Sequence, residues 1–322
     1  MTDEVVVTDY VHGDVRTERD KLGAVGATVR SVEAESTADL LDSVEDARVL
    51  LTTRVEITAD VYAAFPSLEA VIRYGSGYDN VDVDAATDYG VAVVNVPEYC
   101  SEEVATHTIG LILACDRRIV QFDREVHRGT WDPEGQSGMT RLSEKTLGIV
   151  GFGTIGRLVA ERAKSFGVDL LVHSRSATQS DLDAFDAESV SFEDLLARSD
   201  VVTVHTALSD RTRHLFDRAA FETMRDGAIL VNTSRGGVVD QDALVDALAA
   251  DELALAGLDV LAEEPPADDE PLLDRDDVVL TPHAAWYSET ATDEVQRLAT
   301  EEAVRVVRGE RPRNVVNPAA LD

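Results

Sequence analysis

The stretch Val150-Gly151-Phe152-Gly153-Thr154-Ile155-Gly156 decides the fold of this 322-residue chain. It lies between the apolar run 147–150 and a run with helical periodicity from Arg157 to Phe166. In a turn from strand to helix, the first glycine permits a tight bend, the second lets backbone amides approach a pyrophosphate, and the third lets the helix pack closely on the strand. The phosphates would then lie at the positive end of the helix dipole.

A glycine pattern of this kind is common, so its surroundings decide how it is interpreted. The helical run is amphipathic, and a further apolar strand follows it at 169–172. Strand, helix and strand together form one βαβ unit. The sequence therefore predicts a dinucleotide site whose turn supplies Gly151, Gly153, Thr154, Ile155 and Gly156.

Strand-like apolar runs alternate with helical patterns along the rest of the chain. Those before the glycine turn lie at 5–7, 27–29, 48–51, 68–72 and 91–94, and those after it at 201–204, 228–231, 255–258 and 278–280. This alternation predicts an α/β fold with two doubly wound parallel sheets. A long helix is expected from Ser101 to Gly129, and a last helix from about Ser288 to Val307 can return the chain to the first domain.

The charge balance is strongly acidic, with 62 acidic residues against 29 basic ones and a net charge of -33. Such a balance excludes a nucleic-acid binder. Self-repulsion of this size weakens as the Debye length falls to about 3 Å near 1 M salt, which predicts a halophilic protein adapted to a salty cytoplasm. An acidic mesophilic protein is the alternative, but the charge is spread through nearly every helix rather than confined to a tail.

Several further observations bear on where the protein works. No apolar run approaches the roughly 20 residues of a membrane span, and the N-terminus lacks the pattern of a secretory signal. Cys100 and Cys115 have neither metal-ligand spacing nor the number needed for a disulfide framework. We therefore expect a globular protein of the cytoplasm that binds no metal and does not associate with membranes.

Polar blocks follow three of the predicted strands, at 232–237, 259–265 and 281–283. In sheets of this class the ligand site lies beyond the carboxyl ends of the strands. Together with residues 75–82 (G-S-G-Y-D-N-V-D), these blocks resemble the D-isomer-specific 2-hydroxyacid dehydrogenase family. The resemblance covers nearly the whole chain. Residues 282–289 (P-H-A-A-W-Y-S-E) are especially similar to the C-terminal-binding-protein branch, whose members are co-repressors that keep the dehydrogenase fold.

The resemblance implies a domain organisation and a catalytic trio. Residues 1–98 and 291–322 would form a flavodoxin-like substrate domain, and residues 99–290 a Rossmann NAD(P) domain through which two copies form a homodimer. Arg235 would clamp the substrate carboxylate with two parallel hydrogen bonds. His283 would be the general acid or base, and Glu264 would orient its imidazole and favour the imidazolium.

The resemblance also implies further contacts. Amides around Ser76 and Gly77 would complete the carboxylate cradle, and Trp286 would line the substrate pocket, with a packed interface aromatic as the alternative. The cofactor contacts implied are Thr108, Thr206, Thr233 and Asp259. The histidines assigned a structural role are His12, His107, His127 and His214. Thr106 stands where many relatives carry an acid, and its role is not assigned.

The residues after the second strand of the cofactor domain depart from the family pattern. Members that prefer NAD carry an acid there for the ribose 2′-hydroxyl, whereas this chain has Ser174, Arg175 and Ser176. Arg175 can pair with a 2′-phosphate and the two hydroxyls can donate to it. We therefore predict NADP(H) as the preferred cofactor, with NAD(H) possible if the Ser-Arg-Ser segment is a solvent-exposed loop that tolerates both.

The function that these features favour is reduction of small 2-oxo acids such as glyoxylate or hydroxypyruvate by hydride transfer. A dinucleotide-sensing binding protein like the C-terminal-binding relatives is the alternative from another class. D-3-phosphoglycerate dehydrogenase is a third reading, and formate dehydrogenase is disfavoured because that branch carries glutamine at the position of Glu264.

Overall fold

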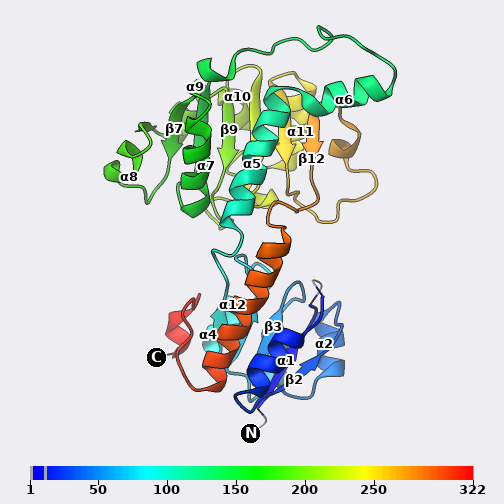
Figure 1. Cartoon of the computed structure of the whole chain (residues 1–322), viewed down its shortest axis with the longest axis vertical. Coiled ribbons are helices and arrows are strands. Elements are labelled where there is room, and N and C mark those ends of the chain that lie inside the picture. The colour runs from blue at the N-terminus through cyan, green and yellow to red at the C-terminus, as the bar shows by residue number, and fades with distance from the viewer. Residues whose placement is uncertain (1–2, 11–12, 322) are drawn as a thin grey trace. The chain divides into compact units, whose positions relative to one another are not determined.

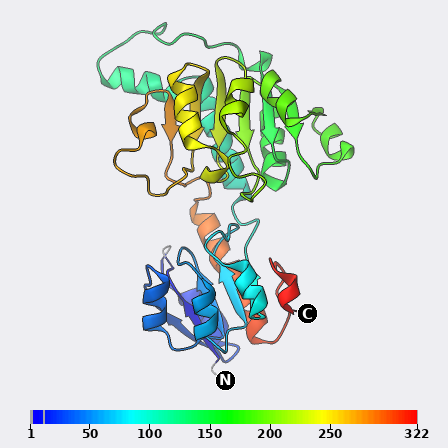
Figure 2. The same cartoon turned by 180° about the vertical axis from the view of Figure 1, so that it is seen from behind.

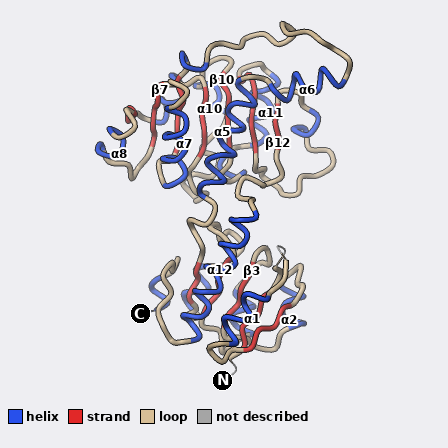
Figure 3. Tube along the Cα trace, viewed as in Figure 1, coloured by secondary structure: helices blue, strands red, loops and turns tan. Residues whose placement is uncertain are grey.

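The computed structural model describes residues 3–10 and 13–321, and the chain divides into two α/β units (Figure 1). One unit runs up to Tyr99 and resumes at Ser288, and the other comprises Cys100–Tyr287. Each unit is built around its own parallel sheet, drawn as red segments in Figure 3 with blue helices beside them.

The first unit has a five-stranded sheet in the order β2-β1-β3-β4-β5. Its strands are β1 (Glu4–Val7), β2 (Thr28–Ser31), β3 (Val49–Thr52), β4 (Ala70–Arg73) and β5 (Ala92–Val94). Its helices are α1 (Arg16–Gly23), α2 (Thr37–Ser43), α3 (Ala59–Ala64), α4 (Val83–Asp88), α12 (Glu289–Val307) and the 3-10 turn η4 (Pro318–Leu321). All its strand pairs are parallel, and this is the flavodoxin-like order.

Two hydrophobic layers hold that sheet. Helices α1 and α12 pack on each other, and side chains such as Leu22 and Val295 join one face of the strands in a buried cluster. Helices α2, α3 and α4 supply Leu40, Val61 and Ala86 to the opposite cluster. The long C-terminal helix is fixed at its start by Ser288, whose hydroxyl accepts from the amide of Ala291 as an N-cap.

The second unit has a seven-stranded sheet in the order β12-β11-β10-β9-β6-β7-β8. Its strands are β6 (Thr146–Val150), β7 (Asp169–His173), β8 (Ala187–Ser189), β9 (Val201–Val204), β10 (Ala228–Asn232), β11 (Leu253–Leu258) and β12 (Val278–Leu280). Its α-helices are α5 (Ser101–Asp116), α6 (Ile119–His127), α7 (Thr154–Lys164), α8 (Gln179–Asp183), α9 (Phe192–Arg198), α10 (Arg218–Thr223) and α11 (Gln241–Ala249). Its 3-10 turns are η1 (Leu142–Glu144), η2 (Gly236–Val238) and η3 (Pro271–Asp274).

The strand order of the second unit, counted from β6, is that of a Rossmann fold with one added strand. Helices α5 and α7 pack together on one face of the sheet in Figure 1, and α9, α10 and α11 cover the other face in Figure 2. The predicted fold class of two doubly wound parallel sheets is confirmed. The order reverses beside β6, so the carboxyl ends of β6 and β9 flank the crevice where such sheets bind ligands.

The expected single helix from Ser101 to Gly129 is wrong. Arg118 adopts a left-handed conformation with φ of 51°, which ends α5 and starts α6 in a new direction. The apolar periodicity of the sequence continues across Arg118. Periodicity therefore cannot reveal that one residue adopts a left-handed conformation. The first helical residue is Ser101, where the helix was expected to start, and Cys100 is its N-cap.

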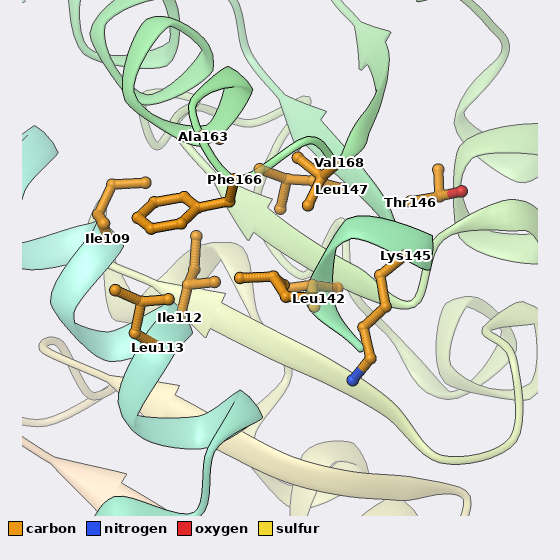
Figure 4. Close-up of a pocket in the computed structure, with 11 residues that line it drawn as sticks. Ile109, Ile112, Leu113, Leu142, Lys145, Thr146, Leu147, Ala163, Phe166 and Val168 are labelled. Carbon is orange, nitrogen blue, oxygen red and sulfur yellow. The ribbon is translucent and has the colours of Figure 1, made fainter. Parts of the chain in front are cut away.

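An apolar pocket lies between α5 and α7 in the second unit (Figure 4). The side chains that line it include Ile109, Ile112, Leu147 and Phe166. Lys145 is at its edge, with its ammonium 2.5 Å from the buried carboxylate of Asp116. None of the residues predicted to act in chemistry lines this pocket.

Candidate active site and cofactor site

The glycine turn has the geometry that dinucleotide binding requires. Gly151 has φ of +96°, and a Cβ there would lie 2.6 Å from the carbonyl oxygen of His205. A Cβ on Gly156 would lie 2.3 Å from the carbonyl oxygen of Gly151, so both positions exclude larger residues. A Cβ on Gly153 would meet no described atom within 4 Å. That open side is where a pyrophosphate can approach the backbone.

The first turn of α7 presents amide groups to the same place. The helix starts at Thr154 after Gly153, which has no side chain to cap it. The amides of Thr154, Ile155 and Gly156 therefore lie in the uncapped first turn, where an anion is stabilised by the helix dipole. Thr206, just after β9, is the neighbour of this turn, since its amide nitrogen lies 2.9 Å from a Cβ built on Gly151. These residues fit a dinucleotide phosphate.

Two buried threonines join α5 to the end of β10. The Oγ1 of Thr108 donates to the carbonyl of Val104 at 2.7 Å and lies 2.8 Å from the Oγ1 of Thr233. Because Thr108 gives its only proton to Val104, Thr233 is the donor between the two hydroxyls. Both predicted cofactor residues therefore lie together near the carboxyl edge of the sheet. Thr106, on the same helix, is exposed.

Three loops at this edge bring the predicted trio together. A Cβ on Gly236 would lie 1.8 Å from the carbonyl oxygen of Leu261, so the loop after β10 rests directly on the loop after β11. Arg235 is half-buried, and its backbone carbonyl accepts from the Nδ2 of Asn232 at 3.0 Å. Its positive charge acts on Glu264 in the neighbouring loop.

Glu264 and His283 form an ion pair. The Nδ1 of His283 donates to Oε2 of Glu264 at 2.5 Å, and the amide of Leu261 donates to Oε1 at 2.9 Å. Partial burial by itself would raise the pKa of Glu264, but the hydrogen bond and charge of His283, with that amide and Arg235, outweigh it and lower the pKa. Since Nδ1 is engaged, Nε2 is the nitrogen that can exchange a proton with a ligand.

Asp259 fastens the loop that carries His283. Its carboxylate is 2% exposed and accepts from the amides of Ala284 and Ala285, each at 2.9 Å, and from the hydroxyl of Thr281 at 2.6 Å. Its backbone carbonyl accepts from the amide of His283 at 2.8 Å. His283 itself has φ of 53°, a left-handed conformation that surrounding contacts must stabilise.

The histidines assigned a structural role differ in their surroundings. The Nε2 of His107 lies 2.9 Å from Oγ1 of Thr281, which belongs to the loop of His283. This contact was not predicted from the sequence. His127 is exposed and contacts the carbonyl of Asp123 in its own helix. His214 lies 3.9 Å from Asp240 on the surface, and His12 lies outside the described residues. No sequence signal marks His107, because its partner is 174 residues away.

The residues predicted to complete the substrate cradle belong to two different units. Ser76 and Gly77 are half-buried just beyond β4, and the carbonyl of Ser76 accepts from the Nδ2 of Asn95 at 2.7 Å. Trp286 is half-buried in the second unit. Its ring packs edge to face with that of Tyr287, with 5.6 Å between the ring centroids.

Comparison with known proteins identifies the family. The sequence model described as "D-isomer specific 2-hydroxyacid dehydrogenase, NAD binding domain" matches residues 109–285. A glyoxylate reductase from Korarchaeum cryptofilum is 39% identical over 86% of this chain and 85% of its own length. The chain belongs to the D-isomer-specific 2-hydroxyacid dehydrogenase family. It therefore carries that family's NAD-binding domain in the second unit.

Two further relatives extend the comparison. The D-3-phosphoglycerate dehydrogenase of Methanocaldococcus jannaschii is 37% identical over 98% of this chain but only 59% of its own length. The chain thus spans between half and three fifths of the phosphoglycerate dehydrogenases that it matches. The crystal structure of a D-lactate dehydrogenase from Aquifex aeolicus with NAD and lactic acid superposes with a TM-score of 0.89 at 25% identity, covering 97% of this chain and 99% of that one.

In Rossmann folds the turn after the second strand lies beside the ribose 2′ position of the dinucleotide, and in this chain that turn follows β7. Ser174 is half-buried and its Oγ accepts from the amides of Ser176 and Ala177, each at 3.3 Å. Arg175 and Ser176 are exposed, and Arg175 forms no ion pair with any described residue. The turn therefore presents an available guanidinium and no carboxylate.

Proposed function

We propose that this chain reduces small 2-oxo acids to 2-hydroxy acids, and can run the reverse reaction, with NADP(H) as preferred cofactor. The observation that carries the proposal is the Glu264–His283 ion pair with the charge of Arg235 beside it. An acid held ready beside a carboxylate clamp is what reduction of a 2-oxo acid needs. Two glyoxylate reductases among its relatives are 39% and 41% identical to this chain, which supports this substrate class.

In the proposed mechanism each residue has a separate task. Arg235 binds the substrate carboxylate through two parallel hydrogen bonds. A nicotinamide cofactor held at the glycine turn, by Gly153 and the first turn of α7, would supply hydride for the reduction. His283 gives the proton on Nε2 to the carbonyl oxygen, so that the carbonyl becomes a hydroxyl and the imidazole becomes neutral. Glu264 holds Nδ1 and stabilises the imidazolium before that transfer.

The cofactor preference rests on the turn after β7. The exposed guanidinium of Arg175 can form charge-assisted hydrogen bonds with a 2′-phosphate. The hydroxyl of Ser174 keeps its own proton available, because its oxygen only accepts from the two amides. With no acid in this turn, nothing repels the extra phosphate, so we propose NADP(H) over NAD(H).

Cofactor and substrate are tested together in one experiment. Oxidation of NADPH and of NADH is measured in several molar KCl against glyoxylate, hydroxypyruvate and 3-phosphohydroxypyruvate, with His283→Ala as the control. The proposal predicts turnover of glyoxylate or hydroxypyruvate with a higher kcat/KM for NADPH. Turnover of the phosphorylated acid alone would replace it by phosphoglycerate dehydrogenase activity. Absence of any turnover with retained NADPH binding would favour the dinucleotide-sensing function that residues 282–289 suggest.

We also propose a homodimer formed through the cofactor unit. Large apolar side chains are exposed on α6 and in the segment after it: Ile119 is 54% exposed, Val126 47% and Trp131 86%. Large apolar side chains exposed along one short segment are typical of an interaction surface. Light scattering in high salt should give twice the subunit mass of 34.9 kDa, and a mass of one subunit would contradict this proposal.

The net charge of -33 supports a halophilic cytoplasmic enzyme. Both cysteines are buried free thiols, which fits a reducing compartment. Within the described residues no helix is long and apolar enough to cross a bilayer. The melting temperature should rise with KCl as the repulsion between acidic side chains is screened, and a melting temperature that is independent of KCl would exclude salt adaptation.

A further inference from the structure

We propose that His107 and Thr281 are positioning residues that hold His283 in its reactive conformation through Asp259. The proposal rests on the proposed function of His283 as general acid. It starts from a chain of side-chain contacts that runs from α5 to the loop after β12: imidazole of His107, hydroxyl of Thr281, carboxylate of Asp259.

The direction of each hydrogen bond follows from the chemistry of the groups. An ionised carboxylate only accepts, so the hydroxyl of Thr281 gives its single proton to Asp259 at 2.6 Å. The same oxygen can then only accept from His107, at 2.9 Å. The imidazole must therefore carry a proton on Nε2. Both the neutral imidazole with a proton on Nε2 and the charged imidazolium can donate this hydrogen bond to Thr281.

Asp259, the last member of this series of contacts, holds the backbone conformation of the loop that carries His283. Asp259 receives the amides of Ala284 and Ala285 on its two oxygens, and the amide of His283 on its backbone carbonyl. These bonds enclose a residue whose φ of 53° is unfavourable for a side chain with a Cβ. Without the hydroxyl of Thr281, Oδ1 of this nearly inaccessible carboxylate accepts only from the amide of Ala284, and the loss of one hydrogen bond to a buried charge weakens the loop.

His107 connects the loop of His283 to helix α5. It stands on α5, one of the longest helices, and its Nε2 also lies 3.6 Å from Oδ1 of Asp259. The side chain of His107 is 27% exposed, so its contact with Asp259 and Thr281 is partly protected from solvent. Helix α5 also carries Thr108, which bonds to Thr233 at the end of β10. One rigid helix thus supports both the cofactor side and the acid side of the site.

The test separates the hydrogen bond from the size of the side chain. Thr281→Val removes the hydroxyl at nearly constant volume, whereas Thr281→Ser keeps it. His107→Gln keeps a donor near the position of Nε2, whereas His107→Leu has none. His127→Leu is the matched control, because His127 is an exposed histidine that contacts only its own helix.

The positioning role predicts a specific pattern of rates. In Thr281→Val and His107→Leu, kcat with a 2-oxo acid should fall about tenfold, the loss expected from one hydrogen bond to a charged group, while KM changes little. Thr281→Ser and His107→Gln should retain most of the rate, and His127→Leu all of it. Equal losses in His107→Gln and His107→Leu, or a loss confined to KM, would overturn the proposal.

A second readout does not depend on turnover. Backbone amide exchange at residues 283–285 should be about tenfold faster in Thr281→Val and His107→Leu than in the parent protein, because the loop opens more often. Unchanged exchange there would overturn the positioning role even if kcat fell. If the parent protein reduced none of the acids, the proposed function would fail, and this exchange measurement would still decide whether His107 and Thr281 hold the loop.

Discussion

The loop of His283 and the turn of Arg175 lie at the carboxyl edge of the same sheet, yet they are built in opposite ways. The loop of His283 is held by four hydrogen bonds to Asp259 and one to Glu264, and the carboxylate of Asp259 is buried. The turn of Arg175 is held mainly by the hydroxyl of Ser174, and its guanidinium is exposed.

The difference matches the tasks proposed for the two regions. Proton transfer depends on a nitrogen placed to within a fraction of an ångström, so the fixed loop lowers the cost of reaching the reactive geometry. Recognition of a 2′-phosphate depends on charge, which acts over a longer distance and tolerates a mobile side chain. Changes in the two regions should therefore affect different kinetic constants and respond differently to salt.

Replacing the acid should give the largest effect. In His283→Gln, kcat for a 2-oxo acid should fall by about 10² to 10⁴, the usual contribution of a general acid. NADPH affinity, followed by fluorescence titration, should stay the same, because the change leaves the glycine turn intact. A fall in kcat of less than tenfold would mean that another group supplies the proton.

Removing the exposed guanidinium should have a smaller and more selective effect. In Arg175→Ala, kcat/KM for NADPH should fall about tenfold or more, while the value for NADH should hold, since only NADPH has a 2′-phosphate. Arg141→Ala is the control, because Arg141 is an exposed arginine that pairs with Glu144. If kcat/KM fell equally with NADPH and NADH, Arg175 would not bind the 2′-phosphate.

Salt should produce the smallest difference between the two regions. Raising KCl from about 0.15 M to 1 M shortens the Debye length from about 8 Å to 3 Å, which weakens an exposed contact more than a sheltered one. The ratio of kcat/KM for NADPH to that for NADH should decline over this range, whereas kcat should not. A constant ratio would place the phosphate contact away from solvent.

Much of the fold could be predicted from the sequence, because the relevant signals are local. The three glycines of the turn sit where backbone contacts or open space require them, and the predicted strands occur with shifts of one or two residues at their ends. The break at Arg118 could not be predicted, since one left-handed residue leaves the apolar pattern unchanged.

The catalytic site shows a similar division. Arg235, Glu264 and His283 lie in short blocks after strands, and the topology brings such blocks to one edge. The roles assigned to them remain predictions. His107 was missed because its contact with Thr281 depends on how α5 crosses the sheet, and no nearby residue signals that crossing.

In the proposed reaction Glu264 orients His283 through its hydrogen bond to Nδ1 and stabilises the imidazolium, and the pH dependence of kcat in Glu264→Gln tests this role. The lowered pKa of Glu264 means that its contribution to the ion pair, and to stability, is present above its ordinary value of 4.5 and is lost as pH falls below it. The parent enzyme should therefore keep the carboxylate of Glu264 charged throughout the range from pH 5 to 9.

In Glu264→Gln the negative charge is absent, so the alkaline fall of kcat should move to lower pH and the maximal rate should drop. The measurement is kcat for glyoxylate with saturating NADPH from pH 5 to 9, in the parent enzyme and in the variant. The account predicts a displaced profile. Superimposable profiles would contradict it, because Glu264 would then have no influence on the proton that His283 donates.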